Sequence, residues 1–545
     1  MENEVARHMH FLLEMLKFTL SLLFIFLSIQ ASAFDLNQLL SDKLYFHVKV
    51  EPSQRIIEVE PLQELYKLNN MSPLWTVHNR PNAAAQELRQ ILSHADDWGL
   101  SAHQYMTPEL TRLFEGVNDR NAVTLEILLS DSYIRFARDL MNGQVLEPDL
   151  IDEDIKMPQK KFDAYTTLVE AAKRPEVMSL ALEKLAPQNK KFQLLLSALK
   201  RLNALKAANA WGDLQDPGRI LKPGARHSVL KEVKKRLHDL GYSVQVTSDV
   251  YDSDLKDAVL RYEELNGLSK TTTLSHSFFR SLAPGLDSRI DRIKANLEKF
   301  RWFPREWGNR YLMVNLAFQE MRVIENGQVV LSMKTVNGRP TRRTPTMRDE
   351  IRRVELSPTW TVPFSIALKD KLPLLQENPY ALERMHIKVY DRNNQEIDPG
   401  SVDWKSVDKT NLYYKFVQQP GPQNALGLVK FPLTNPWFIY MHDTNEHYLM
   451  GRVERYRSSG CVRLEDAFKL AQYLLRDQPQ WTLEEMKAPR NQPLAIPVTQ
   501  PLPVYFLYQT VDVTDQGEIR EVHDSYGQDQ RLIELFKSRG SNEKF

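Results

Sequence analysis

The chain has 545 residues, which is too long for a single hydrophobic core when a domain holds roughly 150 residues. Lysine and arginine number 71 against 70 for aspartate and glutamate, and this formal net charge of +1 excludes a global basic surface for nucleic acid. Hydrophobic residues make up 42% of the chain, which is ordinary for a folded protein. From the length we expect two or three domains, and from the balanced charge we expect partners to bind at local sites.

An apolar segment near the N-terminus has the features of an export signal. Residues 18–29 (FTLSLLFIFLSI) have the length of a signal-peptide core, and the following Ala31-Ser32-Ala33 has the small residues of a cleavage site. We therefore predict a signal peptide over residues 1–33. The alternative is an uncleaved leader that tethers the chain to the inner membrane, which we rank second because the run is short for a membrane span.

Export to an oxidising compartment would bear on the role of the single cysteine of the chain, Cys461. An unpaired thiol in an oxidising compartment is a liability unless its reactivity is used. The alternatives are a buried, inert cysteine and one that links two chains. The cysteine count therefore makes Cys461 a candidate for chemistry without deciding the matter.

The first half of the mature chain is expected to be a helical scaffold domain over residues 34–215. Apolar side chains recur there at helical spacing, as at Leu88, Ile91 and Leu92. Proline and glycine at 217–218 then indicate a linker to the next unit.

A module of three short helices is predicted for residues 220–285. The first helix is expected to end at Gly241. The second is capped by Asp252 and stops at Gly267, and a short third helix contains Phe278.

A β-rich domain is predicted for residues 305–510. Apolar residues alternate from about Tyr311, and Asn326-Gly327 has the sequence of a two-residue hairpin turn. The charged and aromatic stretch 373–418 is long for a connection, so we predict an inserted subdomain that acts as a lid. Residues 511–545 are expected to form a C-terminal hairpin and tail.

The stretch from residue 440 to residue 464, YMHDTNEHYLMGRVERYRSSGCVRL, is where we expect the chemistry. A cysteine attacks as the thiolate, so it needs a base or a positive field nearby. We predict that Cys461 is the nucleophile and that His442, at the end of a strand over residues 437–441, is its base. A helix predicted to start near Leu464 would direct its N-terminal dipole at the sulfur and keep it ionised.

The same stretch suggests an oxyanion hole and a second histidine. Gly460 allows a substrate carbonyl to approach the backbone, and the N–H groups of Gly460 and Cys461 are the candidate donors. His447 lies in the following loop, where a solvated or substrate-contacting role is the better interpretation. The sequence contains no H-E-x-x-H or comparable ligand cluster, so we expect no metal and no cofactor.

The histidine, the Ser-X-Gly-Cys turn at 458–461 and the arginine at Arg463 resemble the signature of YkuD-type L,D-transpeptidases. The resemblance to the long Gram-negative members extends over separated segments, which are residues 296–304, 337–345, 358–363, 369–373 and 419–427. Residues 237–242 and 251–268 resemble the three-helix peptidoglycan-binding module, although a helical spacer without a ligand is an equal alternative.

The resemblance implies a multidomain α+β protein with a helical N-terminal scaffold, a small three-helix peptidoglycan-binding-like module and a β-rich YkuD-type catalytic domain that carries the lid. It implies a periplasmic enzyme whose donor and acceptor are tetrapeptide stems of peptidoglycan. Cys461 would form a thioester with the stem, release D-alanine and pass the acyl group to the amine of a second stem, which makes a 3,3 cross-link. The backbone at Asp443 would orient the ring of His442.

Four residues are assigned to the substrate by the same resemblance: Arg463, Ser459, Tyr440 and Trp360. A structural ion pair is the alternative for Arg463, and a core position is the alternative for Tyr440 and Trp360. Two other functions stay open, namely a non-catalytic wall-binding scaffold and a cysteine hydrolase of wall peptides. A papain-like order is disfavoured because the histidine there follows the cysteine in sequence.

Overall fold

The computed structural model describes residues 48–50, 55–57, 59–70, 72–116, 121–148, 151–155, 157 and 161–541. They belong to two compact units, one from residues 1–142, 160–186 and 539–545, and the other from residues 143–159 and 187–538. The predicted leader over residues 1–33 lies outside the described residues. In the part of the chain that is described, no helix is both long and apolar enough to cross a membrane.

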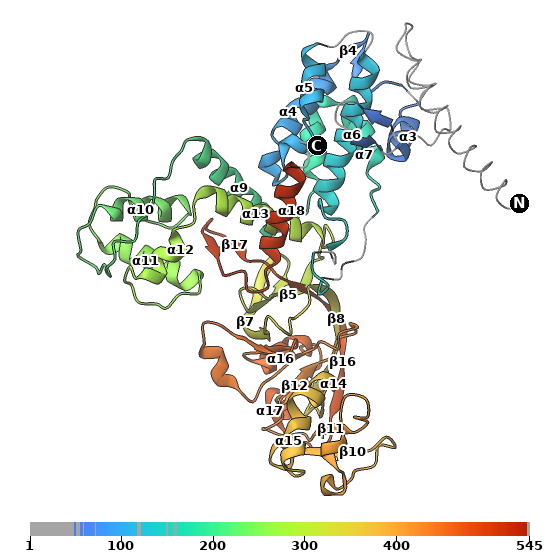
Figure 1. Cartoon of the computed structure of the whole chain (residues 1–545), viewed down its shortest axis with the longest axis vertical. Coiled ribbons are helices and arrows are strands. Elements are labelled where there is room, and N and C mark those ends of the chain that lie inside the picture. The colour runs from blue at the N-terminus through green and yellow to red at the C-terminus, as the bar shows by residue number, and fades with distance from the viewer. Residues whose placement is uncertain are drawn as a thin grey trace, which may run out of the picture. The chain divides into compact units, whose positions relative to one another are not determined.

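The first unit is helical, as predicted (Figure 1). Its core holds the buried carboxylate of Glu126, which accepts hydrogen bonds from the Tyr66 hydroxyl at 2.8 Å and from the Trp75 backbone N–H at 3.1 Å. The helices are α3 Val59–Leu68, α4 Ala83–Ser93, α5 Pro108–Glu115, α6 Ala122–Asn142, α7 Tyr165–Lys173 and α8 Pro175–Glu183, and the short strands are β1 Val48–Val50, β2 Arg55–Ile57, β3 Thr76–Val77 and β4 Arg80–Pro81.

The boundary predicted at residue 215 does not separate the two units. Helix α9, Lys190–Ala207, belongs to the second unit, as do residues 143–159. The reason is packing, because the ring of Phe192 meets that of Phe300 edge to face and the Lys191 ammonium lies 2.9 Å from the Asp512 carboxylate.

The three predicted short helices form, as α10 Val229–Asp239, α11 Ser253–Leu265 and α12 His276–Leu282. Asp252 caps α11 by accepting a hydrogen bond from the Leu255 N–H at 3.1 Å. Edge-to-face contacts of Tyr262 with Tyr242 and with Phe278, each with centroids 5.3 Å apart, join the helices into one small core. Three helices thus form where three were predicted, while their status as a separate module and its kinship with peptidoglycan-binding modules stay predictions.

Helix α13, Leu286–Arg301, leads into a nine-stranded sheet with the order β14-β7-β15-β13-β12-β8-β16-β5-β6. Strand β6 also pairs with β7, so the sheet closes on itself. The strands are β5 Arg310–Asn315, β6 Glu320–Glu325, β7 Gln328–Gly338, β8 Met347–Leu356, β12 Val429–Phe431, β13 Met441–His442, β14 Tyr456–Ser458, β15 Val462–Leu464 and β16 Leu494–Leu507. Asn326 and Gly327, with φ of 51° and 77°, form the predicted hairpin turn between β6 and β7.

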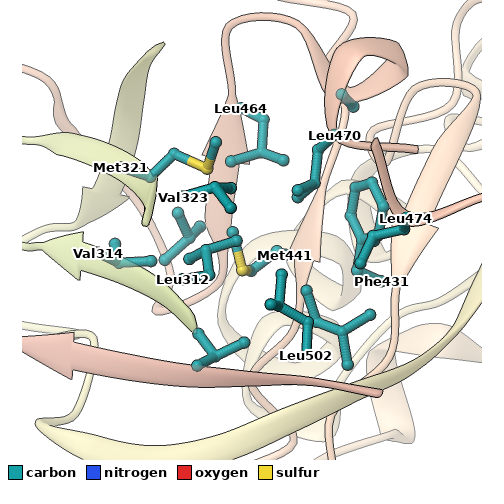
Figure 2. Close-up of a cluster of buried hydrophobic side chains, with 14 of the residues drawn as sticks. Leu312, Val314, Met321, Val323, Phe431, Met441, Leu464, Leu470, Leu474 and Leu502 are labelled. Carbon is teal, nitrogen blue, oxygen red and sulfur yellow. The ribbon is translucent and has the colours of Figure 1, made fainter. Parts of the chain in front are cut away.

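The core of this sheet contains apolar side chains from strands that are distant in sequence (Figure 2). Helices α16, Ala467–Leu474, and α17, Leu483–Lys487, pack against this core, and α16 contributes Leu470 and Leu474 to it. Met441 and Leu464, which flank the candidate catalytic residues, point into the same core. The strands that carry the site are therefore held by burial of their alternate side chains.

An inserted subdomain with its own sheet and core lies between β8 and β12. Its strands are ordered β10-β11-β9, and the subdomain begins at Trp360, ahead of the predicted start at residue 373. The elements are β9 Trp360–Thr361, α14 Phe364–Ile366, a π-helical turn Ala367–Lys371, α15 Leu372–Glu377, β10 Ile387–Tyr390 and β11 Lys415–Gln418. A lid function for it stays a prediction.

The C-terminal hairpin forms from β17, Val511–Val513, and β18, Ile519–Glu521, as predicted. The expected tail is instead helix α18, Gln528–Ser541. Its first turn is fixed by the buried carboxylate of Asp529, which lies 2.5 Å from the Lys299 ammonium. Residues 511–538 are therefore an integral part of the second unit.

Candidate active site

A tight turn presents Cys461 at the start of β15. The Ser458 hydroxyl donates to the Cys461 carbonyl at 2.6 Å and accepts the Gly460 N–H at 3.2 Å. Gly460 has a φ of 119°, and a Cβ there would lie 2.7 Å from Ile439 Cδ1. The turn therefore requires glycine at this position.

The predicted helix N-terminus beside Cys461 is wrong. Leu464 belongs to β15 and pairs with Thr335 of β7, and α16 begins at Ala467 with Asp466 as its cap. The apolar spacing that suggested a helix from Leu464 continues the pattern of α16 backwards into a buried strand. The sulfur is consequently not held ionised by a helix dipole.

The strand predicted over residues 437–441 is mostly a turn. The Asn435 side chain accepts the Ile439 N–H at 3.0 Å and donates to the Ile439 carbonyl at 2.8 Å, while Phe438 has a φ of 57°. Regular pairing is limited to β13, which is Met441–His442.

Strands β13 and β15 are parallel, with His442 opposite Arg463. The Val462 N–H donates to the Tyr440 carbonyl at 3.1 Å and continues this ladder by one step. Because alternate residues of a strand face the same side, Tyr440, His442, Cys461 and Arg463 lie on one face of the pair. The structure thus brings four of the predicted site residues together.

The sulfur of Cys461 is partly buried and contacts Tyr440 and Phe438. The Tyr440 hydroxyl is hydrogen bonded to it, and the thiol lies 3.9 Å from the Phe438 carbonyl. Among the described residues, no hydrogen bond joins the sulfur directly to His442. The Tyr440 side chain contacts both residues. Its hydroxyl is bonded to the sulfur, and its ring centroid lies 5.6 Å from that of His442.

Burial sets the protonation of both candidate catalytic groups. It raises the pKa of the Cys461 thiol to about 11, and the Tyr440 hydrogen bonds and the Lys430 and Arg463 cations oppose it without overcoming it. Burial and then the Arg463 cation lower the pKa of His442 to about 3, although the carbonyls of Asp443 and Leu426 act in the opposite direction. At neutral pH the pair is therefore a thiol and an uncharged imidazole.

The backbone carbonyl of Asp443 lies 2.5 Å from Nδ1 of His442. This contact fixes the proton on Nδ1 and leaves Nε2 as the basic nitrogen. The Asp443 carboxylate faces elsewhere, accepting the Leu428 N–H at 2.9 Å and filling the space above Gly427. His447 is largely exposed, with Nε2 3.6 Å from that carboxylate.

The other predicted substrate residues have partners within the protein. Arg463 forms an ion pair with Glu446, and Ser459 accepts a hydrogen bond from Arg342 Nη1 at 3.1 Å. Trp360, in β9 of the inserted subdomain, is hydrogen bonded to Tyr440. The inserted subdomain therefore supplies a residue of the site.

Of the two candidate oxyanion donors, the Gly460 N–H is already bonded to the Ser458 hydroxyl. The Cys461 N–H has no acceptor among the described residues. Of the predicted pair, the Cys461 N–H is thus the donor that is free for a substrate oxygen.

Sequence reasoning missed Lys430 and Arg342. Lys430 lies opposite His442 in β12, with its ammonium 4.8 Å from the Tyr440 ring centroid. The alternation Val429-Lys430-Phe431 is a signal that could have identified it as facing the site. Arg342 also binds Asp370 of the inserted subdomain at 2.9 Å, and nothing in the sequence signals that partner.

Two protein-family models match the chain. Residues 309–489 match the L,D-transpeptidase catalytic domain, YkuD, and residues 60–199 match the Scaffold domain. A curated protein of Haemophilus influenzae, named "Putative L,D-transpeptidase", is 29% identical over 291 residues. That alignment includes 52% of this chain and 57% of the relative, so the chain spans little more than half the relative's length.

Solved structures of L,D-transpeptidases also match, at low scores. The protein of Xylanimonas cellulosilytica is 13% identical over 54% of this chain and 99% of its own, with a TM-score of 0.17. The protein of Stackebrandtia nassauensis is 11% identical over 48% of this chain and 91% of its own, with a TM-score of 0.21.

Proposed function

Because residues 309–489 match the L,D-transpeptidase catalytic domain, YkuD, we propose that this chain cross-links peptidoglycan through an acyl-enzyme on Cys461. The proposed donor is a tetrapeptide stem, and the reacting carbonyl belongs to the L-centre of its meso-diaminopimelate. The proposed acceptor is the side-chain amine of a second stem, which gives a 3,3 cross-link.

In the first step, the Cys461 sulfur attacks the carbonyl and its proton passes to Nε2 of His442. A carbon–sulfur bond forms, the carbon–nitrogen bond to D-alanine breaks, and the imidazole returns the proton to the leaving amine. The Cys461 N–H would bind the oxygen that becomes negative. In the second step the acceptor amine attacks the thioester, loses a proton to the imidazole and returns the sulfur as a thiol.

The observation that carries this proposal is the register of β13 and β15, which puts the thiol and the imidazole on one face with Nδ1 of His442 tied to a carbonyl. The resting sulfur faces Tyr440 and Phe438. We expect a donor stem to displace the Phe438 contact and to let the sulfur turn towards His442.

Substrate binding is assigned to Arg463, Ser459, Tyr440 and Trp360. Arg463 and Lys430 supply two cationic groups on this face, which lie beside Glu446 and Glu355 and could instead bind the carboxylates of a stem peptide. Glu446 is paired with the Arg463 guanidinium, and the Ser459 hydroxyl accepts a hydrogen bond from the Arg342 guanidinium. A substrate carboxylate would compete with these partners for the two guanidinium groups.

The test is incubation of the purified protein with tetrapeptide-bearing peptidoglycan, followed by mass spectrometry of the muropeptides. We expect 3,3-linked dimers and free D-alanine from the wild type, and neither from Cys461→Ala. Release of D-alanine without dimers would favour the cysteine-hydrolase alternative. Absence of both, with intact binding to peptidoglycan, would favour a non-catalytic scaffold.

The substrate class implies that the chain works in the periplasm, exported by its leader and tethered to the inner membrane if that leader is not cleaved. Cell fractionation with N-terminal sequencing of the recovered protein tests this. A cytoplasmic protein with an intact leader would contradict it.

A further inference from the structure

The loop before β8 is closed by Tyr526, a residue that lies outside the matched catalytic segment 309–489. The Tyr526 hydroxyl donates to the Gly338 carbonyl at 2.6 Å and accepts the Thr344 N–H at 3.3 Å. One hydroxyl therefore joins both ends of this loop, residues 338–344. Tyr526 is 4% exposed.

The same loop holds the turn of the candidate nucleophile. The Thr344 hydroxyl donates to the Gly460 carbonyl at 2.7 Å and accepts the Gly338 N–H at 2.9 Å. Gly338 cannot be replaced, because a Cβ there would lie 2.4 Å from the Arg342 carbonyl. A continuous set of hydrogen bonds thus runs from Tyr526 through Thr344 to Gly460.

The Gly460 carbonyl and the Cys461 N–H belong to one planar peptide group. Fixing the direction of the carbonyl therefore fixes the direction of the N–H. This N–H is the oxyanion donor that the turn leaves free, since the Gly460 N–H is bonded to Ser458.

Tyr526 is itself rigid and retains its proton. Its ring stacks on that of Tyr508 at 4.7 Å with an interplanar angle of 6°, and its N–H donates to the Tyr508 hydroxyl at 2.7 Å. Burial raises the pKa of Tyr526 to about 12, so the hydroxyl stays a donor at neutral pH.

We propose that Tyr526 and Thr344 are positioning residues that aim the Cys461 N–H at the substrate oxyanion, and that the C-terminal segment is thereby part of the catalytic machinery. This inference rests on the proposed function. Neither residue touches the reacting atoms, and both act through the Gly460 peptide.

The test compares Tyr526→Phe, Thr344→Val and Thr344→Ser in the full chain. We expect kcat for transpeptidation to fall about 10-fold in Tyr526→Phe and up to about 100-fold in Thr344→Val, with KM little changed. Thr344→Ser keeps the hydroxyl and should restore most of kcat. Tyr456→Phe is the matched control, because it removes a hydroxyl from the same aromatic cluster that donates to the Ala317 carbonyl.

Alkylation of Cys461 by iodoacetamide separates positioning from loss of structure, because that reaction forms no oxyanion. We expect Tyr526→Phe and Thr344→Val to be alkylated at the wild-type rate. Wild-type kcat in both variants, or slowed alkylation in step with kcat, would overturn the inference. An inactive wild type that makes no cross-links would instead overturn the proposed function.

Discussion

The candidate nucleophile and base are both uncharged at neutral pH. Burial raises the pKa of Cys461 to about 11 and lowers that of His442 to about 3, so a resting thiolate–imidazolium pair is disfavoured. In the proposed mechanism, proton transfer must therefore accompany attack on the substrate. A neutral thiol is also less prone to oxidation between turnovers.

The first prediction concerns the thiol alone. The alkylation rate should keep rising with pH towards a midpoint near 11, well above the ordinary cysteine value of about 8.5, because the thiolate is the reacting species. Intact-mass kinetics with iodoacetamide measure this. Tyr440→Phe, which removes a hydrogen bond that lowers the pKa, should react more slowly still, and a rate that levels off by about pH 9 would contradict the account.

The second prediction concerns the imidazole. A folded-state pKa near 3 means that His442 stays unprotonated as pH falls through 6.5, so kcat/KM should not decline between about pH 7 and 5 through this group. His442→Gln should lower kcat by about 10²- to 10⁴-fold. His447→Gln, which changes an exposed ring, should retain most of it; the reverse ranking would make His447 the base.

At the scale of elements, the inserted subdomain is tied to the cysteine turn by one arginine. Arg342 donates to Asp370 at 2.9 Å and to Ser459 at 3.1 Å. The Arg342–Asp370 ion pair is partly exposed, so it contributes little to the free energy of unfolding. We expect it instead to affect the position of the inserted subdomain.

The third prediction follows from this tie. If the subdomain shields the thioester from water, Asp370→Ala should raise the ratio of hydrolysed stems to cross-linked stems. Replacing residues 363–416 with a short linker should raise the ratio further. Glu396→Gln, which breaks the surface pair with Lys388 in the same subdomain, is the control, and an unchanged ratio in the deletion would refute the lid function.

Secondary structure was predictable where local sequence determines it. The cap at Asp252 and the glycine at Gly267 delimit a real helix, and Asn326-Gly327 is a real hairpin turn. The failures at Leu464 and at residues 437–441 have physical causes. A buried strand followed by a helix leaves a continuous apolar pattern, and a side-chain amide at Asn435 closes a turn that resembles a strand.

At the scale of the whole molecule, the C-terminal hairpin joins the three-helix module to the rest of the second unit. The Ile519 N–H donates to the Leu240 carbonyl at 2.8 Å, and Arg261 forms two hydrogen bonds of 2.8 Å with Glu518. The backbones approach so closely that a Cβ on Gly241 would lie 2.4 Å from the Gly517 carbonyl oxygen.

The fourth prediction uses that approach. Gly241→Ala must adopt a φ of 96° and push the hairpin away, whereas Gly267→Ala adopts a φ of 67° with open space around its Cβ. We expect Gly267→Ala to cost about 1 kcal/mol and Gly241→Ala at least about twice that. Thermal unfolding of the two variants measures the difference, and equal shifts in Tm would show that the close contact is not real.

Some residues of the candidate site can be predicted from the sequence and others cannot. The placement of His442 near Cys461 was predictable, because a single thiol in a Ser-Ser-Gly-Cys turn and a histidine ahead of that turn are local signals. Lys430, Arg342 and Tyr526 were not assigned, because their roles arise from strand register and from contacts across more than a hundred residues.

The central claim is that Cys461 carries the stem as a thioester. Intact-protein mass spectrometry after mixing the protein with a purified tetrapeptide-stem donor, without acceptor, tests it most directly. The account predicts a mass increase equal to the donor minus D-alanine, mapped by proteolysis to Cys461 and absent from Cys461→Ala. Cross-linked product formed by Cys461→Ala, or an adduct on another residue, would contradict it.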